Sequence, residues 1–229
     1  MDKTFNGIDI SEHNGNIDWQ KVKSSGIDFA IIRAGYGINI VQKDSNFDKN
    51  ITLAHRNGIA IGVYWSSHAT NVDTIIKEAE TCVNVIRRYK NIITMPVCLR
   101  FDNDSLNYAK MRNITIDKDI INDFIKHFYV VVNREGFTFA YFANKDTMQI
   151  IGSNNLLNKN LWFSSCDNLQ ESGNSVIPHY NMGLWQYTTN GKVNGIGGNV
   201  SMNIAFSKYK LNNIKNSNLT HKSQRNIIM

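Results

Sequence analysis

The sequence predicts a single-domain α/β fold, a modified and irregular TIM-like (β/α) barrel. Short apolar runs alternate with amphipathic segments, a pattern typical of parallel strands joined by helices. Seven or eight such runs fit into 229 residues, a usual size for a barrel that forms one domain. Helical patterns become sparse after residue 152, so we expect the second half to be less regular than an ideal eight-fold barrel.

The elements follow from hydrophobic periodicity. Strands are predicted at residues 5–9, 29–33, 59–65, 96–101, 138–142, 161–165, 184–188 and 200–204. Helices are predicted at 17–26, 47–57, 73–90 and 117–134. The segment 73–90 has the clearest helical pattern, because Ile75, Ala79, Cys82 and Ile86 recur at helical spacing.

Charge divides the chain into two parts. The net charge is +6, but residues 207–229 hold five Lys and Arg and no Asp or Glu. That leaves 20 basic against 19 acidic residues in 1–206. We therefore expect a nearly neutral barrel domain at 1–206 and a basic, disordered tail at 207–229. No aromatic-basic stripe accompanies the charge, so nucleic-acid binding is not predicted.

Other features exclude several classes of protein. No apolar run approaches the roughly 18 residues of a membrane span, and the N-terminus lacks a signal-peptide pattern. Cys82, Cys98 and Cys166 are widely spaced, and the first two are expected to be buried thiols. The histidines show no metal-ligand spacing, so neither a metal nor a cofactor is predicted. The oligomeric state stays open.

Ligands of such barrels bind at the carboxyl ends of the strands. Aromatic rings stack on sugars and amides bond to hydroxyl and N-acetyl groups, so the residues there suit a carbohydrate groove. The candidates are Asp9, Arg33, Tyr64, Trp65, Arg100, Asp102, Tyr141, Asn144, Ser164, Trp185, Gln186, Tyr187 and Ser201. For any single aromatic residue of this set, packing in the core is an equally good interpretation, and a strand-end arginine such as Arg33 is more often structural.

Several long motifs resemble those of the glycoside hydrolase family 25 lysozymes, of bacterial and phage type. They are residues 7–11 (GIDIS), 15–19 (GNIDW), 29–37 (FAIIRAGYG), 58–65 (GIAIGVYW), 141–146, 185–188 (WQYT) and 191–200. The resemblance covers roughly residues 5–206 in the family's order. It implies a modified α/β barrel, hydrolysis of peptidoglycan between N-acetylmuramic acid and N-acetylglucosamine, and a place at the cell wall or outside the cell.

The same resemblance exposes a degenerate catalytic motif. The family generally carries four acidic groove residues, and the first matches Asp9. An Asp-x-Glu motif, whose Glu is the general acid, matches Arg100 and Asp102. The fourth acid corresponds to Ser201. A segment that helps line the family's groove reads WFSSC at 162–166.

These replacements weaken the implied chemistry. Asp102 is one methylene shorter than Glu, which sets its carboxylate back by about 1.5 Å, and a misplacement of about 1 Å can cost about 10²-fold in rate. Arg100 beside it favours the ionised carboxylate over the protonated acid that glycoside hydrolysis needs. Asp104 could supply another carboxylate, but only through a strand shift that loses the family's Pro-Val anchor at 96–97.

Two interpretations remain open. The first is a catalytically impaired or inactive homologue that binds peptidoglycan or a related glycan, for which Asp102 is mainly the salt-bridge partner of Arg100. The alternative is a slow but active muramidase that uses Asp102 as general acid. His68 lies three residues after Trp65, where a catalytic histidine is conceivable, but without a nucleophile partner in the sequence it is interpreted as a loop histidine.

Overall fold

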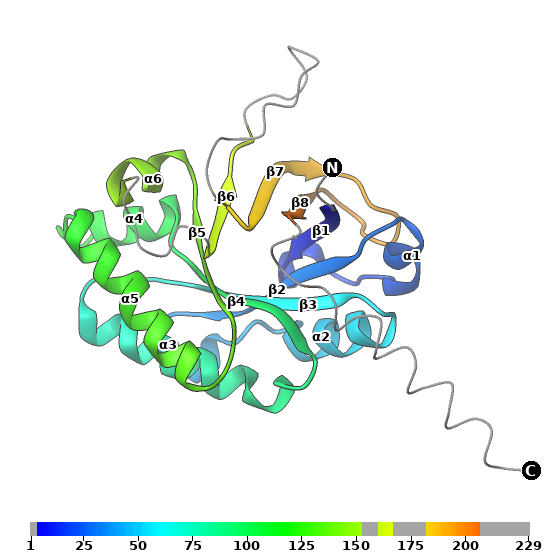
Figure 1. Ribbon diagram of the computed structural model, residues 1–229, viewed down its shortest axis with the longest axis horizontal. Coiled ribbons are helices and arrows are strands. Elements are labelled where there is room, and N and C mark those ends of the chain that lie inside the picture. The colour runs from blue at the N-terminus through cyan, green and yellow to red at the C-terminus, as the bar shows by residue number, and fades with distance from the viewer. Residues whose placement is uncertain (1–3, 153–159, 167–181, 207–229) are drawn as a thin grey trace, which may run out of the picture.

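A computed structural model describes residues 4–152, 160–166 and 182–206. The proposed basic tail at 207–229 lies outside the described residues, so the division at residue 206 stays a prediction. The described chain forms a closed barrel of eight strands in sequence order (Figure 1), which confirms the predicted α/β barrel class. The strands are β1 (Thr4–Ile10), β2 (Phe29–Tyr36), β3 (Ala60–Ser66), β4 (Ile93–Arg100), β5 (Phe139–Ala143), β6 (Leu161–Ser164), β7 (Leu184–Gly191) and β8 (Val200–Phe206).

The barrel departs from an ideal one at its last strand. Strands β1 to β7 pair in parallel, but β8 runs antiparallel to both β7 and β1. The sequence pattern predicted parallel pairing, and this prediction is wrong for β8. Only residues 192–199 connect β7 to β8, and a parallel crossover needs a dozen or more residues. An antiparallel return is the arrangement that so short a connection permits.

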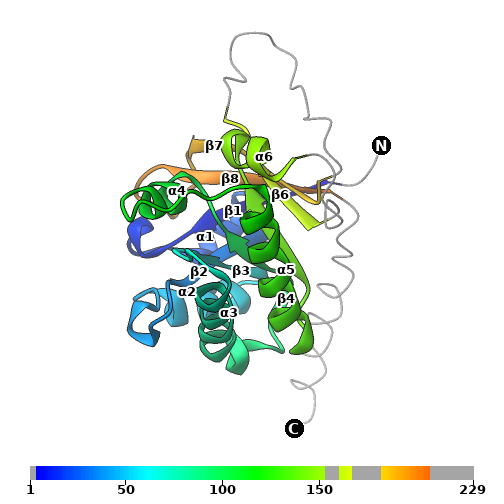
Figure 2. The same ribbon diagram turned by 90° about the vertical axis from the view of Figure 1, so that its left-hand side faces the viewer.

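Helices cover the outside of the barrel. They are α1 (Trp19–Ser24), α2 (Phe47–Arg56), α3 (Val72–Ile86), α4 (Asn103–Lys110), α5 (Lys118–Arg134) and α6 (Lys145–Ile151), with 3₁₀ turns η1 (Glu12–Asn14), η2 (Ile40–Gln42) and η3 (Arg87–Tyr89). The long helices α3 and α5 lie side by side on one flank (Figure 2). The sequence patterns did not predict α4 and α6. Both are short and begin immediately after a strand, where the side chains of Asp102 and Asn144 cap their first turns.

Two buried layers follow from strand alternation. One fills the barrel interior and includes Phe29, Ile31, Tyr64 and Trp162. It is tightly packed: a Cβ atom on Gly7 would lie 2.2 Å from the Phe29 ring. The interior therefore depends on glycine at this position of β1.

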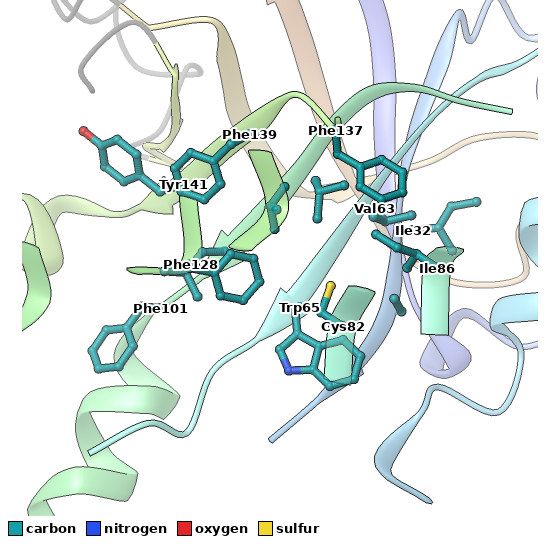
Figure 3. Close-up of a cluster of buried hydrophobic side chains, with 14 of the residues drawn as sticks. Ile32, Val63, Trp65, Cys82, Ile86, Phe101, Phe128, Phe137, Phe139 and Tyr141 are labelled. Atoms are coloured by element: carbon teal, nitrogen blue, oxygen red, sulfur yellow. The ribbon is translucent and has the colours of Figure 1, made fainter. Parts of the chain in front are cut away.

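The second layer lies between the strands and the helices, and Figure 3 shows part of it. Trp65 of β3 lies there beside Cys82 and Ile86 of α3, and Phe128 of α5 packs near Phe139 of β5. The prediction of a buried thiol at Cys82 is confirmed, as is the one for Cys98, and both thiols are free. No helix of the described chain is long and apolar enough to cross a membrane. Within the same residues no three His, Cys, Asp or Glu side chains gather as a metal site.

A buried carboxyl group fixes the loop that follows β3. Glu78 of α3 is 1% exposed, and its Oε1 accepts the backbone N–H of His68 at 2.8 Å. Burial raises the pKa of Glu78 to about 7, and the His68 N–H bond opposes this rise only in part. The carboxyl group thus ties α3 to the loop after β3, whose residue His68 lines the pocket described below.

The raised pKa of Glu78 predicts a stability that falls with pH. Between the ordinary glutamate pKa of 4.5 and about 7, the folded protein keeps a proton that the unfolded chain has released. The free energy of unfolding should therefore decrease across this range, by up to about 3 kcal/mol from this group. Glu78→Gln should flatten the profile between pH 5 and 8, measured by chemical denaturation.

The control is Glu80→Gln, an exposed glutamate of the same helix, which should leave the wild-type profile unchanged. A Glu78→Gln variant that folds and keeps the full wild-type slope would contradict the role of Glu78.

Candidate functional site

A pocket of about 440 Å³ opens where strands β1 to β4 end. Residues from the ends of these strands, from η1 and from the start of α4 form its walls. They are Ser11, Glu12, His13, Arg33, Tyr36, Tyr64, Ser66, His68, Arg100, Asp102, Asp104 and Ser105. The pocket therefore lies at the end of the barrel where ligands of this fold class bind.

Asp9 is the centre of a buried polar network. Its Oδ1 accepts one hydrogen bond from Gln186 Nε2 at 2.7 Å and another from Asn203 Nδ2 at 2.8 Å. Gln186 in turn accepts from the Ser164 hydroxyl, and Asn203 accepts from the Trp162 indole. Asp9 is 6% exposed, so these amides replace much of the hydration that its carboxylate loses. The network connects β1 to β6, β7 and β8.

Arg100 lies between two carboxylates. Its Nη1 is 3.6 Å from Asp9 Oδ2, and its Nε donates to Asp102 Oδ2 at 2.7 Å. The guanidinium carbon also lies 4.6 Å from the centre of the Phe142 ring and 5.4 Å from that of Tyr64. Arg100 therefore lies between the two acids, Asp9 and Asp102, that the family resemblance implies to be catalytic.

The charge of Arg100 is strongly held. Burial by itself lowers the pKa of the Arg100 guanidinium. The Tyr64 phenol, which ionises at a lower pH than Arg100, and the carboxylates of Asp102 and Asp9 outweigh burial and raise this pKa above its ordinary value. Burial also raises the pKa of Tyr64 to about 12, so the phenol stays neutral at physiological pH. The Arg100 guanidinium thus stays positively charged beside a neutral phenol, and the carboxylates of Asp9 and Asp102 face it.

Asp102 has a second structural role. It is the N-cap of α4: Oδ1 accepts the backbone N–H of Asp104 at 3.1 Å, and its own N–H donates to the Ser105 hydroxyl. Both carboxylate oxygens of Asp102 therefore have hydrogen-bond donors within the fold, one on α4 and one on Arg100.

Arg33 lines the pocket but is engaged by two acids. Its Nε donates to Asp44 Oδ2 at 2.8 Å and its Nη2 to Glu12 Oε1 at 2.7 Å. Glu12 is held by the Ser45 N–H and hydroxyl, which together lower its pKa. These contacts fit the structural interpretation of Arg33, while the guanidinium still forms part of the wall.

Two aromatic rings near the carboxylates, those of Tyr36 and His68, line the pocket. The His68 ring stacks on Tyr108 with centroids 4.5 Å apart, and it meets the Tyr36 ring edge to face with centroids 5.7 Å apart. The Arg112 guanidinium carbon lies 3.5 Å from the centre of the Tyr108 ring. Burial lowers the pKa of His68, while Asp102 and Asp104 act in the opposite direction. Tyr108 therefore supports the His68 ring, and Tyr36 and His68 are the aromatic residues of this part of the wall.

The structure separates the predicted site residues into three groups. Arg33, Tyr64, Arg100 and Asp102 line the pocket. Asp9, Ser164 and Gln186 lie in the buried network, and Ser201 pairs with Asp9 in the register of β8 with β1. Trp65, Tyr141 and Trp185 are at most 3% exposed and belong to the layer beneath the helices, and Tyr187 packs on Trp185.

The pocket lies at the carboxyl ends of the strands, but several of the predicted residues face the helices instead of the barrel interior. Tyr64 and Trp65 are consecutive, so only one of them can face the interior. Burial raises the pKa of Tyr141 to about 12, in keeping with its place in the core. Asn144 does not line the pocket either: it caps α6 and donates to Asn103 Oδ1 at 2.8 Å.

Sequence reasoning missed part of the pocket wall. Glu12 and His13 were not predicted because they lie in η1, a turn after β1 whose path the pattern does not define. Tyr36 was not predicted because it ends β2 three residues beyond the predicted strand at 29–33. Ser66 had a usable signal, since it lies two residues after Tyr64 on the same face of β3. Asp104 was interpreted as lying beyond the site, but the first turn of α4 brings it into the wall.

Comparison with known proteins agrees with this fold. The family model of glycosyl hydrolases family 25 matches residues 8–196. Lysozyme M1 of Streptomyces globisporus is 29% identical over 202 residues, which are 86% of this chain and 66% of that protein. The autolysin LytC of Streptococcus pneumoniae, solved in complex with a synthetic peptidoglycan ligand, is 26% identical, with a TM-score of 0.71 over 88% of this chain and 46% of LytC.

A third relative has nearly the same extent as this chain. The lysozyme of Streptomyces coelicolor is 24% identical, with a TM-score of 0.64 over 89% of this chain and 92% of its own, and it supports the fold. The chain thus spans about two thirds of Lysozyme M1 and about half of LytC. Since the family model covers most of the barrel, the chain belongs to glycosyl hydrolase family 25.

Proposed function

We propose that this chain binds peptidoglycan or a related glycan in the pocket and hydrolyses it weakly or not at all. Family membership supports the glycan. So do two relatives: Lysozyme M1 by its name, and LytC by the synthetic peptidoglycan ligand in its structure. The pocket has the size and the aromatic and polar walls that suit sugar units.

The position of Arg100 carries the proposal of impaired catalysis. Glycoside hydrolysis needs a carboxylic acid that can protonate the leaving oxygen. Both oxygens of Asp102 already accept hydrogen bonds, from Arg100 and from the Asp104 N–H. Proton delivery from Asp102 would require it to leave Arg100 and to give up its cap on α4.

Arg100 also places charge of the wrong sign at the base of the pocket. The transition state develops positive charge on the sugar, which carboxylates stabilise. A fixed guanidinium about 5 Å away would oppose that charge by about 3 kcal/mol at an effective dielectric of 20. This corresponds to about two orders of magnitude in rate. Asp9 and Asp102 leave the base with a net formal charge of −1, so this penalty applies relative to the acidic residue that the family resemblance implies at position 100.

The alternative is a slow muramidase in which Asp102 is the general acid and the N-acetyl group of the substrate is the nucleophile. One observation favours it: Asp102 lines the pocket at the end of β4, within reach of a bound ligand. This function requires the Arg100–Asp102 ion pair to open during each turnover.

Dye release from labelled peptidoglycan at several pH values, with co-sedimentation on the same insoluble material, distinguishes the two functions. We expect the wild-type chain to sediment with peptidoglycan and to release little or no dye. Ser66→Phe places a bulky ring in the pocket and should abolish sedimentation. Ser24→Phe, on the exposed surface of α1, should not change sedimentation.

Clear dye release that Asp102→Ala abolishes would establish the alternative and refute impaired catalysis. A chain that neither releases dye nor sediments would refute the glycan function itself. Soluble peptidoglycan fragments should compete for binding, which separates occupation of the pocket from attraction by the basic residues of the chain.

Restoration of the acidic residues tests the cause of the impairment. The triple change Arg100→Asp, Asp102→Glu and Ser201→Asp should create dye release or raise it by at least about 10²-fold, the penalty attributed to Arg100. The matched control Arg100→Asn, Asp102→Gln and Ser201→Asn has similar side-chain sizes without the carboxylates and should stay inactive. If the acidic triple variant folds, by thermal denaturation, and still releases no dye, Arg100 is not the main cause of impairment.

A further inference from the structure

The two arginines of the pocket wall are each matched by more negative charge than they carry. Arg33 has one positive charge and contacts two carboxylates, Glu12 and Asp44, at 2.7 and 2.8 Å. Its third neighbour, His13, lies 3.5 Å from Nη1 and adds no formal charge when neutral. This part of the wall therefore has a net formal charge of −1.

The base of the pocket repeats this imbalance. Arg100 contacts Asp9 and Asp102, which again leaves a net formal charge of −1. Asp104 adds a further carboxylate to the wall. No ion pair or side-chain hydrogen bond joins this carboxylate to another residue of the described chain. With the histidines neutral, the acids around the pocket exceed the arginines by three charges.

The other groups near Asp104 do not cancel its charge. His68 faces Asp104 and Asp102 from the loop after β3, but burial lowers the pKa of His68 and favours the neutral ring at neutral pH. The positive charge of Arg112 also lowers the pKa of His68. The Arg112 guanidinium lies over the Tyr108 ring, however, and is not part of the pocket wall. Asp104 is thus an exposed, uncompensated carboxylate in the same pocket wall as the His68 ring.

We propose that the pocket prefers a glycan that carries a primary amine, such as a glucosamine unit without its acetyl group, and that Asp104 binds the ammonium group. The proposal rests on the glycan-binding function proposed above. His68 and Asp104 both line the pocket, so a sugar ring beside His68 would place its substituents near Asp104. The net charge of the whole chain is +6 and repels cations, so a preference for a cationic ligand must arise locally.

Calorimetric titration with two chemically defined tetrasaccharides tests the preference. One is fully N-acetylated chitotetraose and the other is its fully deacetylated form, compared at pH 6 and low salt, where the amines are protonated. We expect the deacetylated form to bind about three- to tenfold more tightly, as for a partly exposed ion pair. Salt should reduce the difference.

Asp104→Asn should remove the preference, so that the two tetrasaccharides bind this variant with equal affinity. The matched control is Asp119→Asn, because Asp119 occupies the same second position of helix α5 and does not line the pocket. A preference that persists in Asp104→Asn, or equal binding of both tetrasaccharides by the wild type, would overturn the proposal. Failure of both to bind would instead refute the glycan function.

A third ligand identifies the source of the amine. An N-acetylated muropeptide with lysine in its stem peptide carries the ammonium group on the peptide. Tighter binding of this ligand than of its acetyl-lysine form, lost in Asp104→Asn, would support ammonium recognition with the peptide as a source. If only the deacetylated sugar gains affinity, the sugar amine is the group recognised.

Discussion

The guanidinium of Arg100 between Asp9 and Asp102 is the interaction on which the organisation of the site depends. Asp9 is buried at the centre of the barrel end, and the amides of β7 and β8 satisfy only one of its oxygens. Removal of one partner from a buried ion pair is strongly destabilising, because the other charge is left uncompensated. Arg100 supplies that compensation and also holds Asp102 at the start of α4. One side chain therefore joins β1, β4 and α4, and its charge is the basis of the proposal that catalysis is impaired.

The sequence predicted the barrel class because hydrophobic periodicity reports burial, and a closed barrel buries its strands on both sides. It placed the start of β2, β6, β7 and β8 at the residues where these strands begin. It could not give the direction of β8, which the short connection after β7 determines. The helices α4 and α6 escaped detection because each has about two turns, too few for a periodic pattern, although Asp102 and Asn144 are typical capping residues.

The site was predicted less completely than the fold, and alternation explains why. Strand ends identify the level of a ligand site but not which side chains face inward. Trp65, Tyr141 and Trp185 pack against the outer layer. Tyr64, which precedes Trp65, and Gln186, which follows Trp185, face the interior. Asp104 lines the pocket because it lies in the first turn of α4, a helix that the sequence did not predict. The substrate-binding and catalytic roles of the inward residues remain predictions, supported by their positions around the pocket and by the family.

A crystal structure of the chain with a muramyl tetrasaccharide would test most directly whether the Arg100–Asp102 ion pair keeps Asp102 from acting as an acid. We expect an intact tetrasaccharide in the pocket and an Arg100–Asp102 ion pair that is kept beneath it. We also expect that neither oxygen of Asp102 contacts the glycosidic oxygen. A structure that contains cleaved sugar, with Asp102 turned away from Arg100 toward the position of the broken bond, would refute impaired catalysis and establish a working muramidase.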